Sequence, residues 1–125
     1  MSDGASVEVL QTLVDAFNAH DLDRIMAFFA EDCVLEMPRG PSPFGGRFIG
    51  KAAVRDGLAG RFAGLPDVHY GNPEHFVCGD TEISKWTVTG TTPSGQKIQA
   101  NGCDFYSFRD GKLTKKDSYW KIVEA

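Results

Sequence analysis

The feature that most constrains the fold of this chain is a hairpin signal near its carboxyl end. Two alternating segments, 97–108 and 112–123, flank Arg109-Asp110-Gly111, and Asp-Gly between such segments predicts antiparallel strands joined by a tight turn. Side chains alternate between the two faces of a strand. Asp104 therefore shares a face with apolar residues of the first strand: Ile98, Ala100, Gly102, Tyr106 and Phe108. Because an unpaired charge on such a face is costly, we expect Asp104 to be compensated or used.

Two registers are open for the last strand. A three-residue turn with a glycine bulge pairs Phe108 with Lys112. It places three residues beside Asp104: Lys116, Ser118 and Trp120. A two-residue turn pairs Arg109 with Lys112, and because a slip of one residue exchanges the faces, it brings in a different pair: Asp117 and Tyr119. We favour the first register, since Arg-Asp-Gly suits a type I turn followed by a glycine bulge.

The rest of the chain divides into helices first and strands afterwards. Apolar residues at helical spacing predict helices over three ranges: 6–19, 22–30 and 51–63. A strand over 33–37 and a loop rich in glycine and proline, 39–50, separate the second helix from the third. Four strands follow: 68–78, 82–92, 97–108 and 112–123. This order predicts an α+β domain in which helices cover one face of a curved antiparallel sheet, with a pocket between the layers.

Composition and charge exclude several function classes. The 125 residues suffice for one domain with a single core. A net charge of −4, without a basic cluster, argues against nucleic-acid binding. No apolar run is long enough to cross a membrane, and the start at Met1–Gly4 lacks the features of a signal peptide. We therefore expect a cytoplasmic protein with no nucleic-acid or membrane partner.

Cysteine, histidine and lysine residues give no signal for a metal or nucleic-acid site. The three cysteines are widely spaced and without a C-x-x-C pair, so we expect reduced, mostly buried thiols: Cys33, Cys78 and Cys103. His69 and His75 lie at even spacing on one predicted strand, but no carboxylate or cysteine joins them at ligand spacing. The pair Lys115-Lys116 is interpreted as solvated surface charge.

Four stretches of the chain resemble the SnoaL-like polyketide cyclases, within the superfamily of nuclear transport factor 2 and ketosteroid isomerase. They are Phe17-Asn-Ala-His-Asp21, Phe29-Ala-Glu-Asp-Cys33, Lys85-Trp-Thr-Val-Thr-Gly-Thr91 and Asp104-Phe-Tyr-Ser-Phe-Arg-Asp-Gly-Lys-Leu113. The resemblance spans nearly the whole chain and implies one such domain over residues 1–125. It also implies a cone-shaped, curved antiparallel sheet with three helices on its concave face, the cystatin-like roll. This fold carries enzymes and non-enzymes alike.

The resemblance further implies acid/base proton transfer on a small apolar or polycyclic carbonyl compound, without cofactor or metal. Asp104 matches both the oxyanion-hole Asp of ketosteroid isomerases and the late-strand carboxylate of the cyclases, and is the candidate catalytic residue. An apolar surround would favour its protonated form, which suits a general acid. The other positions differ, because Met37 and Leu13 stand where isomerases carry their base and tyrosine. The second cyclase carboxylate falls near Ser118, with Asp117 one step away.

Five residues are candidates for substrate binding: Phe17, Met37, Trp86, Ser118 and Trp120. The apolar members of this set also have a plain interpretation as core residues. Asp104 could likewise form a structural ion pair with Lys116, and a pair without a neighbouring cavity would count against catalysis. A non-catalytic ligand-binding module and a dimerisation domain with a collapsed pocket therefore stay open. By resemblance we expect a homodimer through the outer sheet face.

Overall fold

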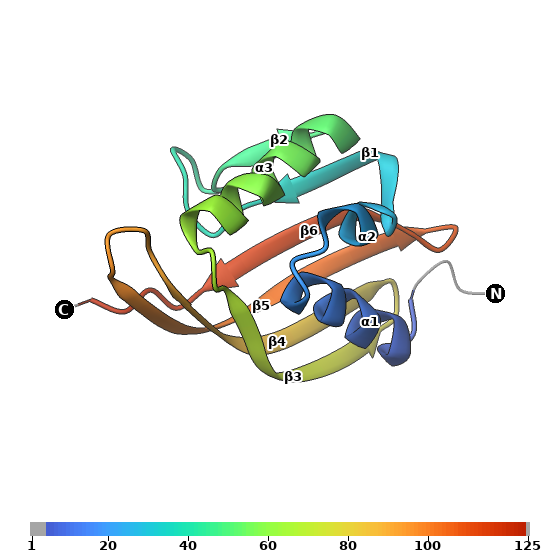
Figure 1. Ribbon diagram of the computed structural model, residues 1–125. Helices are drawn as coiled ribbons and strands as arrows, with labels where there is room; N and C mark the ends of the chain where they lie inside the picture. Colours follow the sequence, from blue (N-terminus) through green and yellow to red (C-terminus); the bar gives the residue numbers. More distant parts are fainter. Residues whose placement is uncertain (1–4, 125) are drawn as a thin grey trace.

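A six-stranded sheet curves around three helices, in the strand order β2-β1-β6-β5-β4-β3 (Figure 1). The strands are β1 Phe29–Glu36, β2 Arg47–Ile49, β3 His69–Cys78, β4 Thr81–Thr91, β5 Lys97–Arg109 and β6 Lys112–Trp120. The helices are α1 Val7–Asn18, α2 Leu22–Met26 and α3 Lys51–Gly64. This computed structural model describes residues 5–124, so the start at Met1–Gly4, where we expected no signal peptide, lies outside the described residues.

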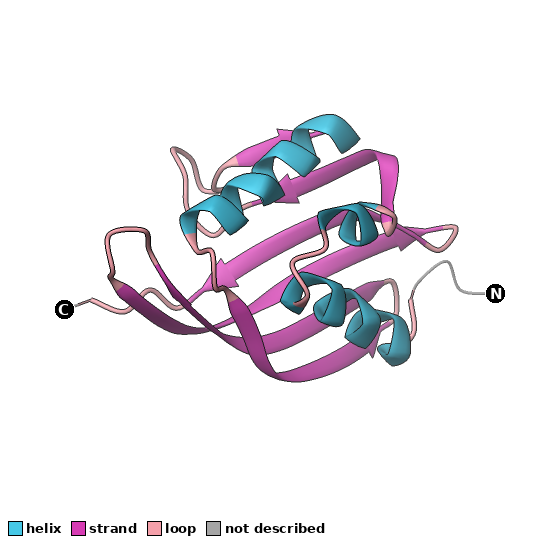
Figure 2. Cartoon of the chain, in the orientation of Figure 1, coloured by secondary structure: helices cyan, strands magenta, loops and turns pink. Residues whose placement is uncertain are grey.

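The expected α+β class and the curved sheet with helices on one face are confirmed. The helices gather on the concave side, where α1 lies against β3 and α3 lies against β1 and β2 (Figure 2). All neighbouring strands are antiparallel except β1 and β6, which run parallel. The sheet is therefore mixed, and its two edge strands, β2 and β3, do not pair with each other in the order of strands.

The second predicted helix is too long in its sequence-based form. Asp21 caps α2 as expected, since its side chain accepts a hydrogen bond from the Arg24 backbone N–H at 3.1 Å. The helix ends at Met26, however, and β1 already begins at Phe29, which pairs with Leu113 of β6. Phe29 suits the helical spacing equally well, so periodicity could not separate the two. The predicted loop 39–50 also contains the short strand β2.

The final hairpin places the expected residues of β6 on the concave face, but its turn differs from the predicted one. Its turn has two residues, Asp110 and Gly111, with φ of 52° and 76°, and it pairs Arg109 with Lys112. The predicted three-residue turn is therefore wrong. A bulge at 114 then shifts the register by one residue, so Ser118 lies opposite Asp104. The bulge thus restores the set expected on the concave face: Lys116, Ser118 and Trp120.

The core lies between the helices and the concave face of the sheet. Leu13, which aligns with the isomerase tyrosine, is fully buried there. The expectation of mostly buried thiols is wrong, because Cys78 is exposed, Cys103 is half-buried and only Cys33 is buried. All three thiols are free. No helix within residues 5–124 is both long and apolar enough to span a membrane.

Candidate active site

Asp104 lies in the middle of the concave face and is only 3% exposed. Two aromatic side chains donate hydrogen bonds to its Oδ2: the Trp86 indole N–H at 3.0 Å and the Tyr106 hydroxyl at 3.2 Å. Trp86 comes from β4 and, as expected, shares this face with Asp104. We predicted an apolar surround for Asp104. The structure differs, because the polar groups of these two aromatic side chains point at the carboxylate.

Residues of β6 hold the other carboxylate oxygen. The Lys116 ammonium group donates to Oδ1 at 3.0 Å, and the Ser118 hydroxyl donates to the same atom. Lys116 also donates to Ser118 at 2.9 Å. Four donors thus converge on one carboxylate, which stabilises its charged form inside the protein.

Lys116 corrects the interpretation of Lys115-Lys116 as a solvated pair. Its side chain is 6% exposed, and its Nζ lies 5.1 Å from the centre of the Phe17 ring. Lys115 points to the other face, is 40% exposed and pairs with Glu36 at 3.2 Å. Alternation along β6 separates the two lysines, and the bulge decides which of them enters the cone.

A small cavity adjoins this cluster. It has a volume of about 10 Å³, which is room for one water molecule. Its walls come from α1 and from β3, β4, β5 and β6, and they include two expected residues, Phe17 and Trp86. Tyr70 closes it from β3, and burial raises the pKa of its hydroxyl well above the ordinary value. Asp104 therefore has an ion-pair partner and a cavity that is nearly filled.

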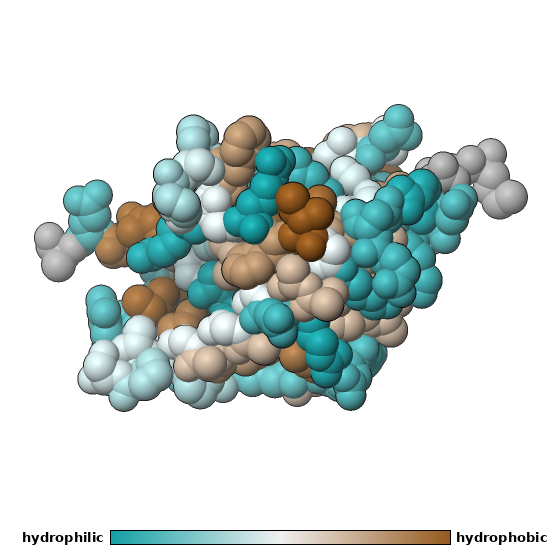
Figure 3. All heavy atoms as spheres, turned by 90° about the horizontal axis from the view of Figure 1, so that it is seen from above, coloured by the Kyte–Doolittle hydropathy of each residue, from teal (hydrophilic) through white to brown (hydrophobic). Residues whose placement is uncertain are grey.

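The expected pocket residue Trp120 lies next to this cluster and is covered by α3. Its ring packs edge to face on Trp86, with centroids 6.2 Å apart. The Arg61 guanidinium group of α3 stacks on the Trp120 ring, with its central carbon 4.4 Å from the ring centroid. Burial lowers the pKa of Arg61. Seen from above, the side that carries α3 and β2 shows small groups of hydrophobic side chains among hydrophilic ones (Figure 3).

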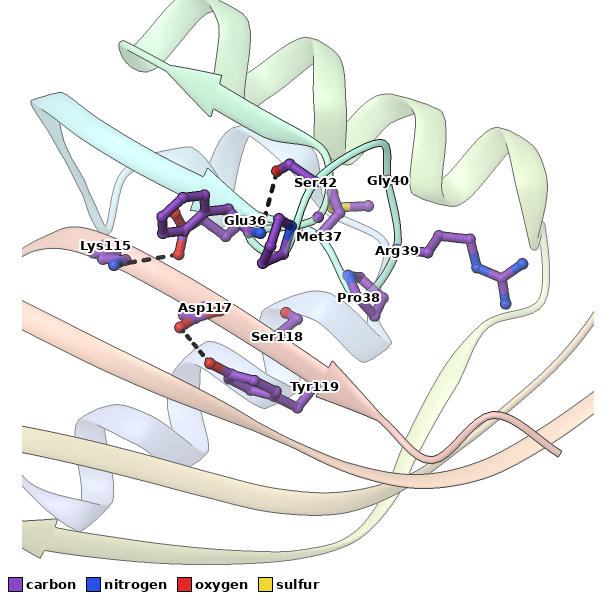
Figure 4. A pocket seen from close by; sticks show the side chains of 13 residues that line it. Glu36, Met37, Pro38, Arg39, Gly40, Ser42, Lys115, Asp117, Ser118 and Tyr119 are labelled. Atoms are coloured by element: carbon purple, nitrogen blue, oxygen red, sulfur yellow. Dashed lines mark hydrogen bonds and ion pairs between the residues drawn. The ribbon is translucent and has the colours of Figure 1, made fainter.

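A larger hollow of about 470 Å³ opens where β1 and β6 separate (Figure 4). Pairing of these strands ends at Glu36 and Asp117, and the following loop curves away from β6. Two expected substrate-binding residues line the hollow, Met37 and Ser118. Ser118 also contacts Asp104, so it connects the hollow with the buried cluster.

The outer part of this hollow carries charged groups that are paired with one another. Glu36, 2% exposed, contacts Lys115 and also Arg47, whose guanidinium group lies 2.8 Å away. The Tyr119 hydroxyl donates to Asp117 at 3.1 Å. Burial raises the pKa of Asp117, and the nearby charge of Glu36 adds to this effect. Asp117 lies on the outer face, so it is not the missing cyclase carboxylate of the cone.

Sequence reasoning missed a polar group on the far side of Asp104. A bulge in β3 between 71 and 74 exchanges the faces, so His69 and His75 lie on opposite sides rather than on one side as expected. His75 turns inward, and its Nδ1 lies 2.8 Å from the Ser84 hydroxyl. Ser84 in turn is the diagonal neighbour of Tyr106 across β4 and β5, and its hydroxyl lowers the pKa of Tyr106. The pair Asn72-Pro73 could have indicated this bulge, because asparagine tolerates a positive φ and proline inside a strand marks an edge or a bulge. Among residues 5–124, no cluster of three or more metal-ligating side chains occurs.

Comparisons with known proteins agree with this fold. Residues 10–116 match the family of the SnoaL-like domain. A candidate polyketide cyclase from Xanthomonas campestris pv. campestris is 26% identical, with coverage of 91% of this chain and 88% of that one and a TM-score of 0.80. TerC, co-crystallised with polyporic acid, is 22% identical, with coverage of 92% and 90% and a TM-score of 0.77.

A third similar structure is a hypothetical protein from Catenulispora acidiphila, in complex with trimethylamine, whose fold is described as ketosteroid isomerase-like. It is 14% identical, covers 94% of this chain with 88% of its own length, and has a TM-score of 0.80. The likeness at this identity concerns the fold alone. A search of curated proteins gives no match.

Proposed function

This chain belongs to the SnoaL-like domain family, and from that premise we propose that it is a cofactor-independent enzyme that moves protons on a small apolar carbonyl compound. The observation that supports this most is Asp104, a nearly buried carboxylate on which four donors converge. Such an arrangement is preorganised, since the donors are already in place before any substrate binds.

The chemistry follows from the charges around Asp104. As a carboxylate it can accept a proton from the carbon next to a carbonyl group. The negative charge then moves to the carbonyl oxygen, where Lys116 and Ser118 are the available donors. Aldol ring closure and double-bond isomerisation both begin with this step. The similar candidate polyketide cyclase favours ring closure as the overall reaction.

The substrate would approach through the hollow beside β6. Its volume of about 470 Å³ suits a small organic molecule, whereas the inner cavity of about 10 Å³ does not. Met37 and Ser118 would contact the substrate first, and Phe17, Trp86 and Trp120 would form the apolar inner wall. Side chains above Trp120, among them Arg61, have to move before a ring system can reach Asp104.

Turnover tests the proposal. The wild-type protein is screened with cyclisable polyketides and β,γ-unsaturated ketones, together with Asp104→Asn and the matched control Asp80→Asn. Asp80 is exposed in the turn between β3 and β4 and lines neither the hollow nor the inner cavity, so its loss should leave activity unchanged. We expect Asp104→Asn to lose about a hundredfold or more in kcat. Equal rates for wild type and a folded Asp104→Asn protein would remove Asp104 from the mechanism.

One observation favours a second candidate, a non-catalytic ligand-binding or dimerisation module. Asp104 is paired with Lys116, and the cavity beside it is nearly filled. A structural ion pair would have the same geometry. In that case the screened compounds would either raise the melting temperature without being converted or have no effect at all. We also propose a homodimer through the outer sheet face, as the resemblance implied.

A further inference from the structure

We propose that Tyr106, Ser84 and His75 form a proton relay that connects the buried Asp104 carboxylate with solvent. The catalytic use of this relay rests on the proposed function, but the relay itself is a property of the resting protein. The relay would supply a path for proton exchange with solvent, which the contacts of Asp104 described above do not provide. A carboxylate that takes or gives a proton in each turnover has to exchange it with solvent, and Asp104 is 3% exposed.

The chain of contacts crosses three strands. The Tyr106 hydroxyl of β5 donates to Asp104 Oδ2 at 3.2 Å. Ser84 of β4 lies opposite Asp104 and diagonally next to Tyr106 on the same face, and its hydroxyl lowers the pKa of Tyr106. His75 Nδ1 of β3 lies 2.8 Å from Ser84 Oγ. Ser84 and Tyr106 are almost completely buried, whereas His75 is half-buried at the rim of the sheet. The contacts therefore lead step by step from Asp104 to the surface.

The outer end of the chain has a fixed orientation. His75 Nε2 lies 2.8 Å from Gln11 Oε1, and the Gln11 amide nitrogen donates to Asp15 at 2.9 Å. Because the Gln11 oxygen can only accept, His75 Nε2 has to carry a proton. The protonation of Nδ1 is then the single variable of this ring, and Nδ1 is the atom that faces Ser84.

Two states of the chain satisfy every group. In the first, charged His75 donates from Nδ1 to Ser84, Ser84 donates to Tyr106, and Tyr106 donates to the Asp104 carboxylate. If each proton moves one step along these bonds, His75 becomes neutral and Asp104 becomes protonated, while both hydroxyl groups remain neutral. In the second state all donors point towards Nδ1. The transfer moves one proton in total and requires no other reactant.

The electrostatics of the two ends are compatible with this exchange. Burial lowers the pKa of His75, and the Asp15 carboxylate of α1 opposes that shift. On β4, the same face carries Ser84 and, two residues away, the buried Glu82. Burial and the charge of Asp104 raise the pKa of Tyr106 far above its ordinary value. Tyr106 therefore passes protons as a neutral hydroxyl group and does not ionise.

Titration of His75 in the resting protein tests the relay without any substrate. With ¹⁵N-labelled histidine, the three histidines are followed by NMR from about pH 5 to about pH 9, and His75→Gln assigns the signal. Tyr106→Phe removes one hydroxyl that does not contact His75 directly. We expect it to lower the His75 midpoint by about half a pH unit or more, because the charged ring loses its continuous link to a carboxylate.

Tyr119→Phe is the matched control, since its hydroxyl binds Asp117 on the outer face. It should leave the His75 midpoint in place. Asp104→Asn keeps the shape of the side chain and should lower the midpoint as well, which gives a second variant in case Tyr106→Phe folds poorly. A His75 midpoint that neither variant moves would overturn the relay, whether or not turnover is found.

Kinetic measurements then distinguish the proposed relay from the proposed enzymatic activity. With a substrate from the screen, His75→Gln should lower kcat about tenfold with KM unchanged, and small diffusible buffers should restore the rate. His69→Gln, on the opposite face of the same strand, should have no effect. An unchanged kcat in His75→Gln overturns the relay as a catalytic device. A His75 midpoint that responds to Tyr106→Phe, without turnover of any compound, supports the relay and contradicts only the proposed enzyme.

Discussion

At the scale of single residues, Lys116 governs the cost of keeping Asp104 inside the protein. Both side chains are almost completely buried, and burying a lone charge costs several kcal/mol. The pair is compensated by hydrogen bonds to Ser118, Trp86 and Tyr106. Loss of one partner therefore matters more than loss of both, because only the first leaves an unpaired charge.

Lys116→Met should lower the free energy of unfolding by about 3–5 kcal/mol, because it strands the Asp104 carboxylate. Adding Asp104→Asn to this variant should recover most of the loss. Urea denaturation at neutral pH measures both. Lys115→Met is the control: Lys115 is partly exposed and Glu36 keeps Arg47, so we expect less than about 1 kcal/mol. A double variant no more stable than Lys116→Met would contradict this account.

Glu82 is a second buried carboxylate, and it lacks the donors that Asp104 has. It is fully buried, and neither carboxylate oxygen has a hydrogen-bond partner of good geometry within the described residues. Burial raises its pKa above the ordinary 4.5, and the Ala5 backbone opposes that rise only in part. The unfolded chain therefore loses this proton more readily than the folded one. The folded state is penalised as the pH rises above about 4.5, and below that value the penalty vanishes.

Glu82→Gln should therefore stabilise the protein at pH 7 and have no effect near about pH 4. Because the carboxyl group lies close beneath the surface, we expect a gain of at most about 1 kcal/mol. Thermal and urea unfolding across this pH range measure it. Glu74→Gln, at an exposed position of β3, should change stability at neither pH. A gain of equal size at both pH values would show that ionisation is not the cause.

The sequence identified Asp104 because an acid on an apolar strand face stands out by alternation alone. The partners of Asp104 were harder to predict. Trp86 followed from the same alternation, whereas the burial of Lys116 was weighed only as an alternative. His75 was interpreted only as evenly spaced with His69 on one strand, and the bulge in β3 places the two on opposite faces. Side-chain type was informative wherever the strand was regular, and it misled where the backbone departed from the period of two.

At the scale of elements, two bulges determine which residues enter the cone. One in β6 offsets the two-residue turn and brings Ser118 opposite Asp104. The other, in β3, turns His75 inward and leaves His69 outside. A bulge adds one residue to one strand and exchanges the faces beyond it. The β6 bulge at 114 has no glycine or positive φ to mark it. The β3 bulge does have a signal, because Asn72 adopts a φ of 52° and Pro73 follows it, and both residue types are typical of an interrupted strand.

Gly102 shows the same dependence on backbone packing within β5. It lies opposite Trp86, and an added Cβ would meet the Trp86 ring at 2.8 Å and the Tyr119 carbonyl oxygen still closer. Gly102→Ala should therefore displace the indole that donates to Asp104 and destabilise the fold by about 1–3 kcal/mol. Tryptophan fluorescence and thermal unfolding report the two effects.

Gly60 of α3 provides the contrasting substitution. A Cβ at this position would meet nothing within 4 Å, and alanine favours helices over glycine. Gly60→Ala should stabilise the protein by about 0.5–1 kcal/mol and leave the tryptophan spectrum unchanged. If both glycine substitutions behaved alike, the close contact between Gly102 and Trp86 would not be the cause of the loss.

At the scale of the whole molecule, the fold was predictable and the state of its pocket was not. Amphipathic helices followed by long alternating strands fix an α+β layer structure, because each element has one face to bury. The width of the space between the layers depends on a few side chains instead. Lys116 and Tyr70 line the space that is left here, and its volume is only about 10 Å³.

The outer face of the sheet is the remaining large surface, and none of the helices within residues 5–124 covers it (Figure 2). Phe76, Ile83 and Phe105 lie side by side across β3, β4 and β5, and the Tyr119 ring packs on Phe105 with centroids 5.5 Å apart. Phe76, Phe105 and Tyr119 are each at least 40% exposed. A continuous, exposed apolar strip of this kind is typical of a protein interface.

We therefore expect a dimer in solution, formed through this strip, and Phe105→Lys should convert it to monomers by placing a charge at its centre. Sedimentation equilibrium over a range of concentrations measures the change. Ile49→Lys, at the exposed edge strand β2, is the matched control and should leave the dimer intact, because β2 lies at the opposite end of the sheet from β3. A wild-type protein that stays monomeric at high concentration would contradict the interface. Dissociation by Ile49→Lys alone would move it to the β2 edge.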